Sequence, residues 1–244
     1  MINKEPEINV DRAYSEHLDR LGHSRSKELI KAGYDVWYGK VLPKDKNATI
    51  YDYGCGHGDF LEYLSLKGYK NISGGDINSE CVRIASERVH FPIQLIVKTL
   101  GFKEINKDKY DCINIKDVIE HIDKEYLVEF LLDIKETLKP EGFIIVSCPQ
   151  ICGFTSLFTL YDDFTHKTIF TENSLRYVLN SAGYGRIELI KPVIPFSFNP
   201  LKIISRGLRL LWFQTIKVIY CLERPGERMP SIPGDRISCM AWKR

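Results

Sequence analysis

Residues 51–59, YDYGCGHGD, set glycines at alternate positions between two acids. The glycines are Gly54, Gly56 and Gly58. A glycine-rich turn between a strand and a helix lets a ligand approach the backbone, and the helix start offers free N–H groups. Dinucleotide-binding turns have the pattern Gly-x-Gly-x-x-Gly, but Asp59 stands where the third glycine belongs. Together with Asp52, this acid disfavours a pyrophosphate and favours a cationic ligand.

A third acid, Asp76, follows in the segment GGDIN, eighteen residues past Gly58. A carboxylate at the end of a second parallel strand can accept hydrogen bonds from both hydroxyls of a ribose. The sequence therefore indicates a ligand with a cationic group and a ribose.

Two histidines are candidates for proton transfer, because imidazole titrates near neutral pH. His166 lies in the polar segment DDFTH, and we predict that it is a general base with Asp163 orienting its ring. The alternative role for His166 is a hydrogen bond that stabilises its loop. His121, in IEHI, is the reserve candidate, with helix capping as its alternative role, and His57 is expected to be exposed.

A metal site has little support in the sequence. Asp117, Glu120 and His121 are close in the chain, but carboxylates at a helix start also interact favourably with the helix dipole. We therefore predict no bound metal.

Composition excludes several classes of protein. The 244 residues are 44% hydrophobic, enough for a full core, and a net charge of +2 gives no reason to expect nucleic acid as a partner. The seven cysteines have no Cys-x-x-Cys spacing, which indicates reduced, buried thiols. The charged N-terminus has no signal-peptide core, and no apolar stretch is long enough to span a bilayer. We expect a cytoplasmic protein.

Strands and helices alternate along the first part of the chain. The expected strands are 48–53, 71–76, 93–97, 110–116 and 143–148, followed by 186–190 and 237–242. The helices expected between them are 60–68, 79–90 and 124–138, with two short ones within 14–41 and another beginning at TENSL. Strands that are apolar on both faces predict an α/β fold with a doubly wound, mostly parallel, seven-stranded sheet. Ligands of such sheets bind outside the carboxyl ends of the strands.

We expect one domain over residues 1–244: a helical cap over 1–47, a cofactor-binding core over 48–149, and a substrate-side part over 150–244. The last part includes the helix 201–223, whose charged residues share one narrow face. They are Lys202, Arg206, Arg209 and Lys217. We predict that this helix is a lid over the pocket or a contact in a homodimer, in preference to a membrane-surface helix.

Four segments together resemble class I S-adenosylmethionine-dependent methyltransferases, in order and spacing over about residues 48–149. They are IYDYGCGHGDFL, GGDIN, YDCINIKDVIEHI and LKPEGFIIVSCP. The resemblance implies S-adenosylmethionine as cofactor, with Asp52 near its ammonium group, Asp76 on the ribose and the strand-three end near the adenine. An acid commonly follows strand three in this family, whereas this chain has VKTLG. The implied cofactor-binding residues are Asp52, Tyr53, Gly54, Gly56, Gly58, Asp76, Ile77, Thr99 and Lys116.

A narrower resemblance covers residues 162–184, DDFTHKTIFTENSLRYVLNSAGY, which is similar to bacterial methyltransferases that accompany sugar and polysaccharide biosynthesis. It implies an O-methyltransferase for a carbohydrate hydroxyl, on a nucleotide-linked sugar or a glycan. Two alternatives stay open: an O-methyltransferase for a small phenolic quinone precursor, because DVIEHI occurs there too, and a non-catalytic cofactor-binding module. An NAD-dependent oxidoreductase is disfavoured by the glycine spacing.

Overall fold

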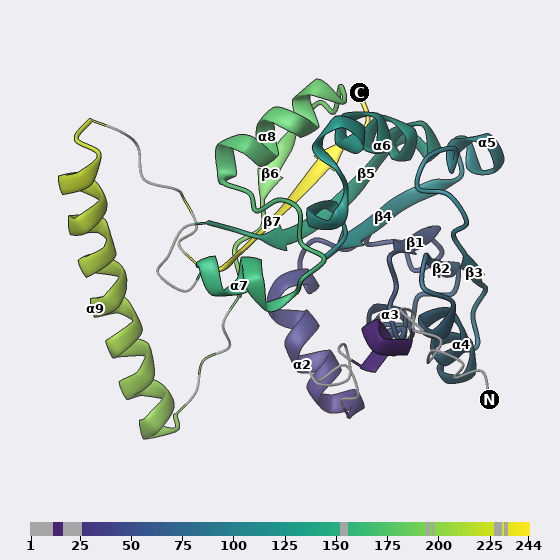
Figure 1. Ribbon diagram of the computed structural model, residues 1–244. Coiled ribbons are helices and arrows are strands. Elements are labelled where there is room, and N and C mark those ends of the chain that lie inside the picture. Colours follow the sequence, from purple (N-terminus) through teal and green to yellow (C-terminus); the bar gives the residue numbers. More distant parts are fainter. Residues whose placement is uncertain are drawn as a thin grey trace, which may run out of the picture.

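The computed structural model describes residues 12–16, 26–151, 156–193, 196, 198–226, 231 and 234–244. Its centre is a seven-stranded sheet in the order β3-β2-β1-β4-β5-β7-β6 (Figure 1). The strands are β1 (Ile50–Tyr53), β2 (Ile72–Asp76), β3 (Ile93–Leu95), β4 (Tyr110–Lys116), β5 (Leu138–Pro149), β6 (Ile187–Leu189) and β7 (Arg236–Trp242). β1 to β5 pair in parallel, and β7 is antiparallel to both β5 and β6. The predicted doubly wound, mostly parallel sheet is confirmed.

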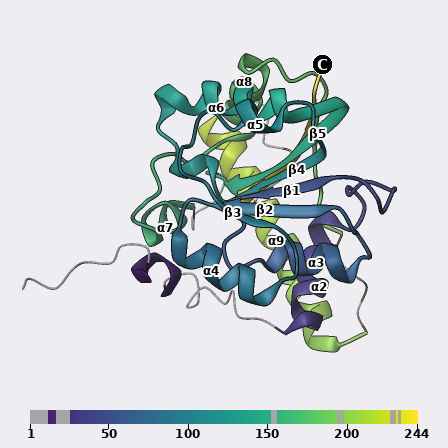
Figure 2. The same ribbon diagram turned by 90° about the vertical axis from the view of Figure 1, so that its right-hand side faces the viewer.

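Helices cover both faces of the sheet (Figures 1 and 2). One face carries α2 (Lys27–Tyr38), α3 (Asp59–Leu66) and α4 (Ser79–Arg88). The other carries α5 (Lys103–Asn106), α6 (Lys124–Thr137) and α8 (Glu172–Ser181). α7 (Ser156–Asp162) and the short helix η1 (Ile119–His121) lie in the connections after β5 and β4.

The two faces have separate cores, as a doubly wound sheet requires. On one face, Phe130 and Leu131 of α6 pack on Ile113 of β4 in a large apolar cluster. On the other, Tyr38 of α2 and Tyr63 of α3 share a cluster with strand residues. Strand residues therefore face apolar partners on both sides, which is why the strands read as continuous apolar runs.

Two strands, β3 and β5, differ from their predicted boundaries. β3 ends at Leu95, earlier than expected, and β5 begins at Leu138, because Leu138 already pairs with Tyr110 of β4 before a shift in register. α8 begins as predicted, with Thr171 as its N-cap. The backbone N–H of Thr171 donates to Oγ of Ser174 at 2.8 Å, which completes a capping box.

The helix predicted at 201–223 forms as α9 (Pro200–Glu223), but it buries none of its residues. It stands beside the sheet rather than over the carboxyl ends of the strands (Figure 1). Leu211 is 67% exposed, and Cys221 of the same helix is an exposed thiol, unlike the buried one expected. The prediction of a lid is therefore wrong for this structure.

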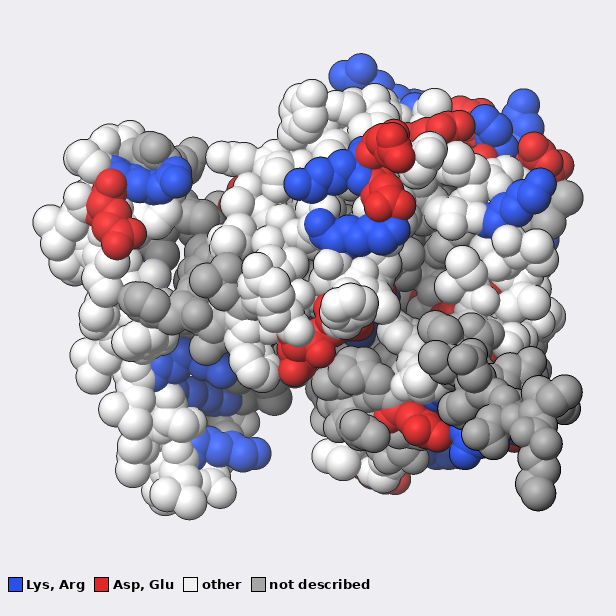
Figure 3. All heavy atoms as spheres, in the orientation of Figure 1, with Lys and Arg blue, Asp and Glu red and all other residues white. Residues whose placement is uncertain are grey.

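The surface of α9 is divided by charge. Blue Lys and Arg atoms gather on the side that faces the rest of the chain, and the outer side is mostly white (Figure 3). No helix in the described part of the chain is long and apolar enough to cross a membrane.

A matched pair of substitutions tests this placement of α9. Leu131 is fully buried in α6, so Leu131→Ala should lower the free energy of unfolding by about 2–5 kcal/mol. Leu211→Ala should change it by less than about 0.5 kcal/mol, since little apolar surface is lost from a core. Denaturant titration of both variants measures the difference. Equal losses would show that α9 is packed in solution.

Candidate active site

The glycine turn after β1 has a conformation that requires glycine. Gly54, Gly56 and Gly58 have φ values of 76°, 49° and 83°. The N–H groups of Gly54 and Cys55 both donate to the carbonyl of Gly75 in β2, at 2.8 and 3.0 Å. A Cβ atom on Gly54 would lie 2.3 Å from Cγ2 of Val118. The turn is therefore held against β2, with no room for a side chain at its first glycine.

Asp76 ends β2 directly beside this turn. Its Oδ2 accepts from the N–H of Gly56 at 2.8 Å, and its Oδ1 accepts from the N–H of Asn78 at 2.9 Å. Burial raises the pKa of the carboxyl group. Each carboxylate oxygen has two lone pairs, so each can accept one further hydrogen bond, as two ribose hydroxyls would require.

Asp52 lies in β1 below the turn and is buried. Asn114 Nδ2 donates to its Oδ1 at 2.7 Å. Burial raises the pKa of Asp52 to about 7, against the opposing effect of the Asn114 hydrogen bond. A cationic ligand at Asp52 would stabilise the ionised form.

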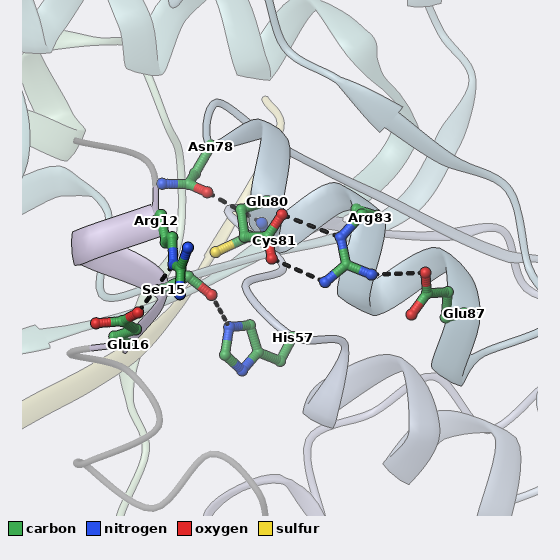
Figure 4. Close-up of polar contacts among 9 residues, drawn as sticks. All are labelled: Arg12, Ser15, Glu16, His57, Asn78, Glu80, Cys81, Arg83 and Glu87. Atoms are coloured by element: carbon green, nitrogen blue, oxygen red, sulfur yellow. Dashed lines mark hydrogen bonds and ion pairs between the residues drawn. The ribbon is translucent and has the colours of Figure 1, made fainter. Parts of the chain in front are cut away.

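Two expectations at this turn are wrong. Asp59 forms an ion pair with Arg88 of α4, so its charge is used inside the protein and is not left for a cationic ligand. His57 is 3% exposed rather than solvent-facing, and its Nε2 lies 2.9 Å from Oγ of Ser15 (Figure 4). Ser15 belongs to the helical segment 12–16, which thus lies over the glycine turn as part of the predicted cap.

The remaining predicted cofactor residues surround the same turn. Tyr53 places its ring in the core, and its hydroxyl donates to the backbone carbonyl of Thr99 at 3.4 Å, which fixes the segment after β3. Ile77 is 65% exposed just after β2. Lys116 ends β4 and pairs with Asp117 at 2.5 Å. A contact of Tyr53 with a cofactor would therefore have to come from its backbone.

His121 and His166 lie together, although 44 residues separate them in the sequence. The N–H groups of Lys167 and Thr168 donate to the carbonyl of Glu120 at 2.8 and 3.1 Å, which ties the second loop to η1. The two imidazole rings have centroids 4.8 Å apart. The structure therefore brings the first-choice and the reserve base candidate into one site.

Hydrogen bonds define the tautomer of each ring. The His166 Nδ1 lies 2.9 Å from the carbonyl of Thr159, which can only accept, so His166 Nδ1 carries a proton. Thr165 donates its hydroxyl proton to Asp163 at 2.6 Å and must therefore accept from His121 Nδ1, 2.8 Å away. In the neutral rings, the lone pairs are on both Nε2 atoms.

Asp163 acts on a different histidine from the one predicted. Its Oδ2 is 3.9 Å from Nε2 of His166, too far for a hydrogen bond, whereas it holds His121 through Thr165. Burial lowers the pKa of His121, which favours a neutral ring at neutral pH. The signal that was missed is Thr165, one residue before His166.

Glu120 was not predicted as a site residue, and it is the most unusual group here. It is fully buried, and neither carboxylate oxygen has a hydrogen-bond partner among the described residues. Burial raises its pKa well above the ordinary range. From the sequence Glu120 was considered only with Asp117 and His121, because His166, its second histidine neighbour, is distant in the chain.

The segment 12–16 links the two halves of the site. The ring centroid of Tyr14 lies 6.5 Å from that of His121. Burial raises the pKa of Tyr14 above its ordinary value, and the charges of Asp163 and Asp76 raise it further. The segment 12–16 therefore contacts the glycine turn through Ser15 and lies beside His121 through Tyr14.

Comparison with known proteins identifies the family of the chain. The sequence model of a methyltransferase-domain family matches residues 11–189, well over half of the chain. The chain belongs to this methyltransferase family, whose cofactor is S-adenosylmethionine. The positive-φ glycine turn and the buried Asp52 and Asp76 suit the amino-acid and ribose parts of this cofactor.

Curated relatives cover part of the chain. The mitochondrial ubiquinone biosynthesis O-methyltransferase of Saccharomyces cerevisiae is 26% identical over 132 residues, which are 48% of this chain and 39% of that protein. The ubiquinone biosynthesis O-methyltransferase of Rickettsia bellii is 29% identical over 102 residues, 40% of each chain. This chain thus spans about two fifths of the length of these relatives.

Solved structures share the fold over nearly the whole chain. A SAM-dependent methyltransferase from Archaeoglobus fulgidus superimposes with a TM-score of 0.64 at 20% identity, covering 93% of this chain and 99% of that one. A 1,6-didemethyltoxoflavin-N1-methyltransferase from Burkholderia thailandensis, solved with S-adenosylhomocysteine, gives 0.53 at 15% identity, covering 95% and 84%.

Asp76→Asn should weaken S-adenosylmethionine binding at least about tenfold, because charge-assisted hydrogen bonds to the ribose contribute about 1.5–3 kcal/mol each. Isothermal titration calorimetry measures the affinity, with the exposed Asp45→Asn as the matched control. If Asp76→Asn binds S-adenosylmethionine as tightly as the wild type, the assignment of Asp76 to the cofactor site is contradicted.

Cofactor affinity should also depend on pH through Asp52. Its pKa is about 7 in the free protein, so the group is neutral below that pH. An ammonium ligand needs the ionised form, and binding must then release a proton. Affinity should fall about tenfold per unit below about pH 7, while the ammonium itself stays charged below its pKa of about 8. Asp52→Asn should flatten this slope, and an unchanged slope would contradict the assignment.

Proposed function

We propose that the chain transfers a methyl group from S-adenosylmethionine to a hydroxyl oxygen of a small molecule. The observation that carries this proposal is the pair of adjacent imidazoles of His121 and His166, whose Nδ1 hydrogen bonds leave the lone pairs on Nε2. A hydroxyl needs to lose its proton during the transfer, and a neutral imidazole with a free lone pair can accept it.

When bound, the cofactor supplies the methyl group and departs as a neutral thioether. The protein residues hold the acceptor oxygen in line and remove its proton. His166 Nε2 accepts this proton as the oxygen–carbon bond forms and the sulfur–carbon bond breaks. His121 is the second acceptor of the proton, held in its tautomer by Thr165 and Asp163.

We infer a phenolic acceptor, such as a quinone precursor, as the first candidate. The named relatives from Saccharomyces cerevisiae and Rickettsia bellii support it. Phe158 and Tyr161 of α7 and Phe164 after it are at least 70% exposed beside the histidine loop. Exposed rings at this place suit the face of an aromatic acceptor.

A carbohydrate hydroxyl is the second candidate, and it was the first choice from the sequence. The segment 162–184 supports it, through its resemblance to methyltransferases that accompany sugar biosynthesis. A sugar hydroxyl ionises much less readily than a phenol, so it would depend more strongly on the imidazole pair. Methyl transfer to catechols and to nucleotide sugars, tested in parallel, separates the two candidates.

His166→Ala should lower turnover about 10²–10⁴-fold, the usual effect of removing a general base. Cofactor affinity should stay nearly unchanged, because the Nε2 atom is not a predicted cofactor contact. Steady-state kinetics and calorimetry measure the two effects, and His121→Ala is the companion variant.

The two variants together assign the base. If His166→Ala keeps more than about a tenth of wild-type turnover while His121→Ala does not, His121 is the base. Full activity of both variants would contradict the role of the imidazole pair and indicate an acceptor that ionises without a base.

A further inference from the structure

We propose that Glu120, His121 and His166 bind a divalent metal cation. The ligand atoms that these three residues offer all lie within 4.8 Å of one another. Two imidazoles and one carboxylate form a common donor set for a divalent ion with open coordination positions. The site was not predicted, because the sequence does not show that His166 lies beside η1.

Both histidines are already oriented as ligands. Each ring uses Nδ1 for a hydrogen bond, to the carbonyl of Thr159 or to the hydroxyl of Thr165, and directs its lone pair to Nε2. Metal-binding histidines usually donate their other ring N–H in this way, which fixes the tautomer and the orientation of the ring. The Thr165–Asp163 hydrogen bond extends the same arrangement by one more step.

The carboxylate of Glu120 is an independent observation that points to a ligand. It is 0% exposed, and its two oxygens have no hydrogen-bond partner in the described part of the chain. A buried polar group of this kind is costly unless it is paired. Protonation alone leaves its O–H without an acceptor there, whereas a cation between it and the imidazoles pairs the carboxylate directly.

The neighbouring acids are engaged elsewhere. Asp117 pairs with Lys116 and with Arg236 of β7, and these cations hold its pKa well below the ordinary range despite burial. Asp163 accepts two hydrogen bonds from Thr165. The donor set is therefore two nitrogens and one carboxylate, which suits Zn²⁺ or Fe²⁺ better than the oxygen-seeking Ca²⁺ and Mg²⁺.

The role of the cation in the reaction rests on the proposed function. With only three protein ligands, a cation has positions left for an oxygen of the acceptor, and it lowers the pKa of a hydroxyl that it binds. The hydroxyl proton then passes to solvent, the oxygen–carbon bond forms and the sulfur–carbon bond breaks. In that state the two Nε2 atoms are ligands and no longer bases, so the cation replaces the imidazole pair in activating the hydroxyl. His121→Ala and His166→Ala then lose turnover because the cation is lost.

The test uses full-length protein stripped with a chelator and titrated with Co²⁺ or Zn²⁺. We expect one ion per chain by elemental analysis, and visible absorption bands for Co²⁺ that report nitrogen and oxygen ligands. Glu120→Gln and His166→Ala should each lower the metal affinity at least about tenfold, as lost ligand contacts do. His90→Gln, which removes an exposed histidine elsewhere, is the matched control and should bind normally. Mg²⁺ should compete poorly.

Two results would overturn the proposal. Binding of Co²⁺ that is unchanged in both Glu120→Gln and His166→Ala would place the ion elsewhere. Full turnover in protein shown to be free of metal would refute the role in the reaction, while leaving methyl transfer with an imidazole base intact. Cofactor affinity, measured separately in Glu120→Gln, should equal that of the wild type. A failure of the cofactor site is therefore distinguishable from a failure of the metal site.

Discussion

The carbonyl of Gly75 accepts hydrogen bonds from two consecutive N–H groups, and this contact sets the geometry of the glycine turn on which the predicted cofactor site depends. It holds the glycine turn against the end of β2, where Gly56 then donates to Asp76. The contact exists because β1 and β2 are parallel and in register, Tyr53 opposite Gly75. A side chain on Gly54 would contact Val118, so the same turn also fixes the segment after β4. The carboxyl ends of neighbouring strands thus position both Asp76 and the segment that carries His121.

A second backbone contact completes the site. The carbonyl of Glu120 accepts from two successive N–H groups of the loop after α7, which brings His166 beside His121. The cost of this arrangement is a buried carboxylate that has no hydrogen-bond partner among the described residues, in a place where polar groups are normally paired. Unsatisfied groups of this kind are concentrated at functional sites, because binding supplies the missing partner. The imidazole pair and Glu120 are therefore best understood as one unit.

The sheet could be predicted from the sequence because its signals are local, and the prediction of the cofactor residues rests on local signals too. Alternating apolar strands and helices determine the doubly wound sheet, and Gly54 and Asp76 are identified by their spacing from a strand end. The contacts of Asp59 and His57 could not be predicted, because Arg88 and Ser15 reach them from distant segments. The same applies to Asp163, which holds His121 through Thr165 rather than His166. For α9, amphipathicity predicted the helix correctly but not its position, since a stripe of apolar residues does not specify what it contacts.

The central claim is that the methyl group goes to an oxygen activated by His121 and His166. The most direct measurement is a reaction with S-adenosylmethionine carrying a ¹³C-labelled methyl group, offered with catechols and nucleotide sugars, followed by NMR of the product. The account predicts a ¹³C signal typical of an O-methyl group, formed by the wild type and strongly reduced in His166→Ala. A label found on nitrogen or carbon would contradict it, as would an O-methyl product formed equally fast without both imidazoles.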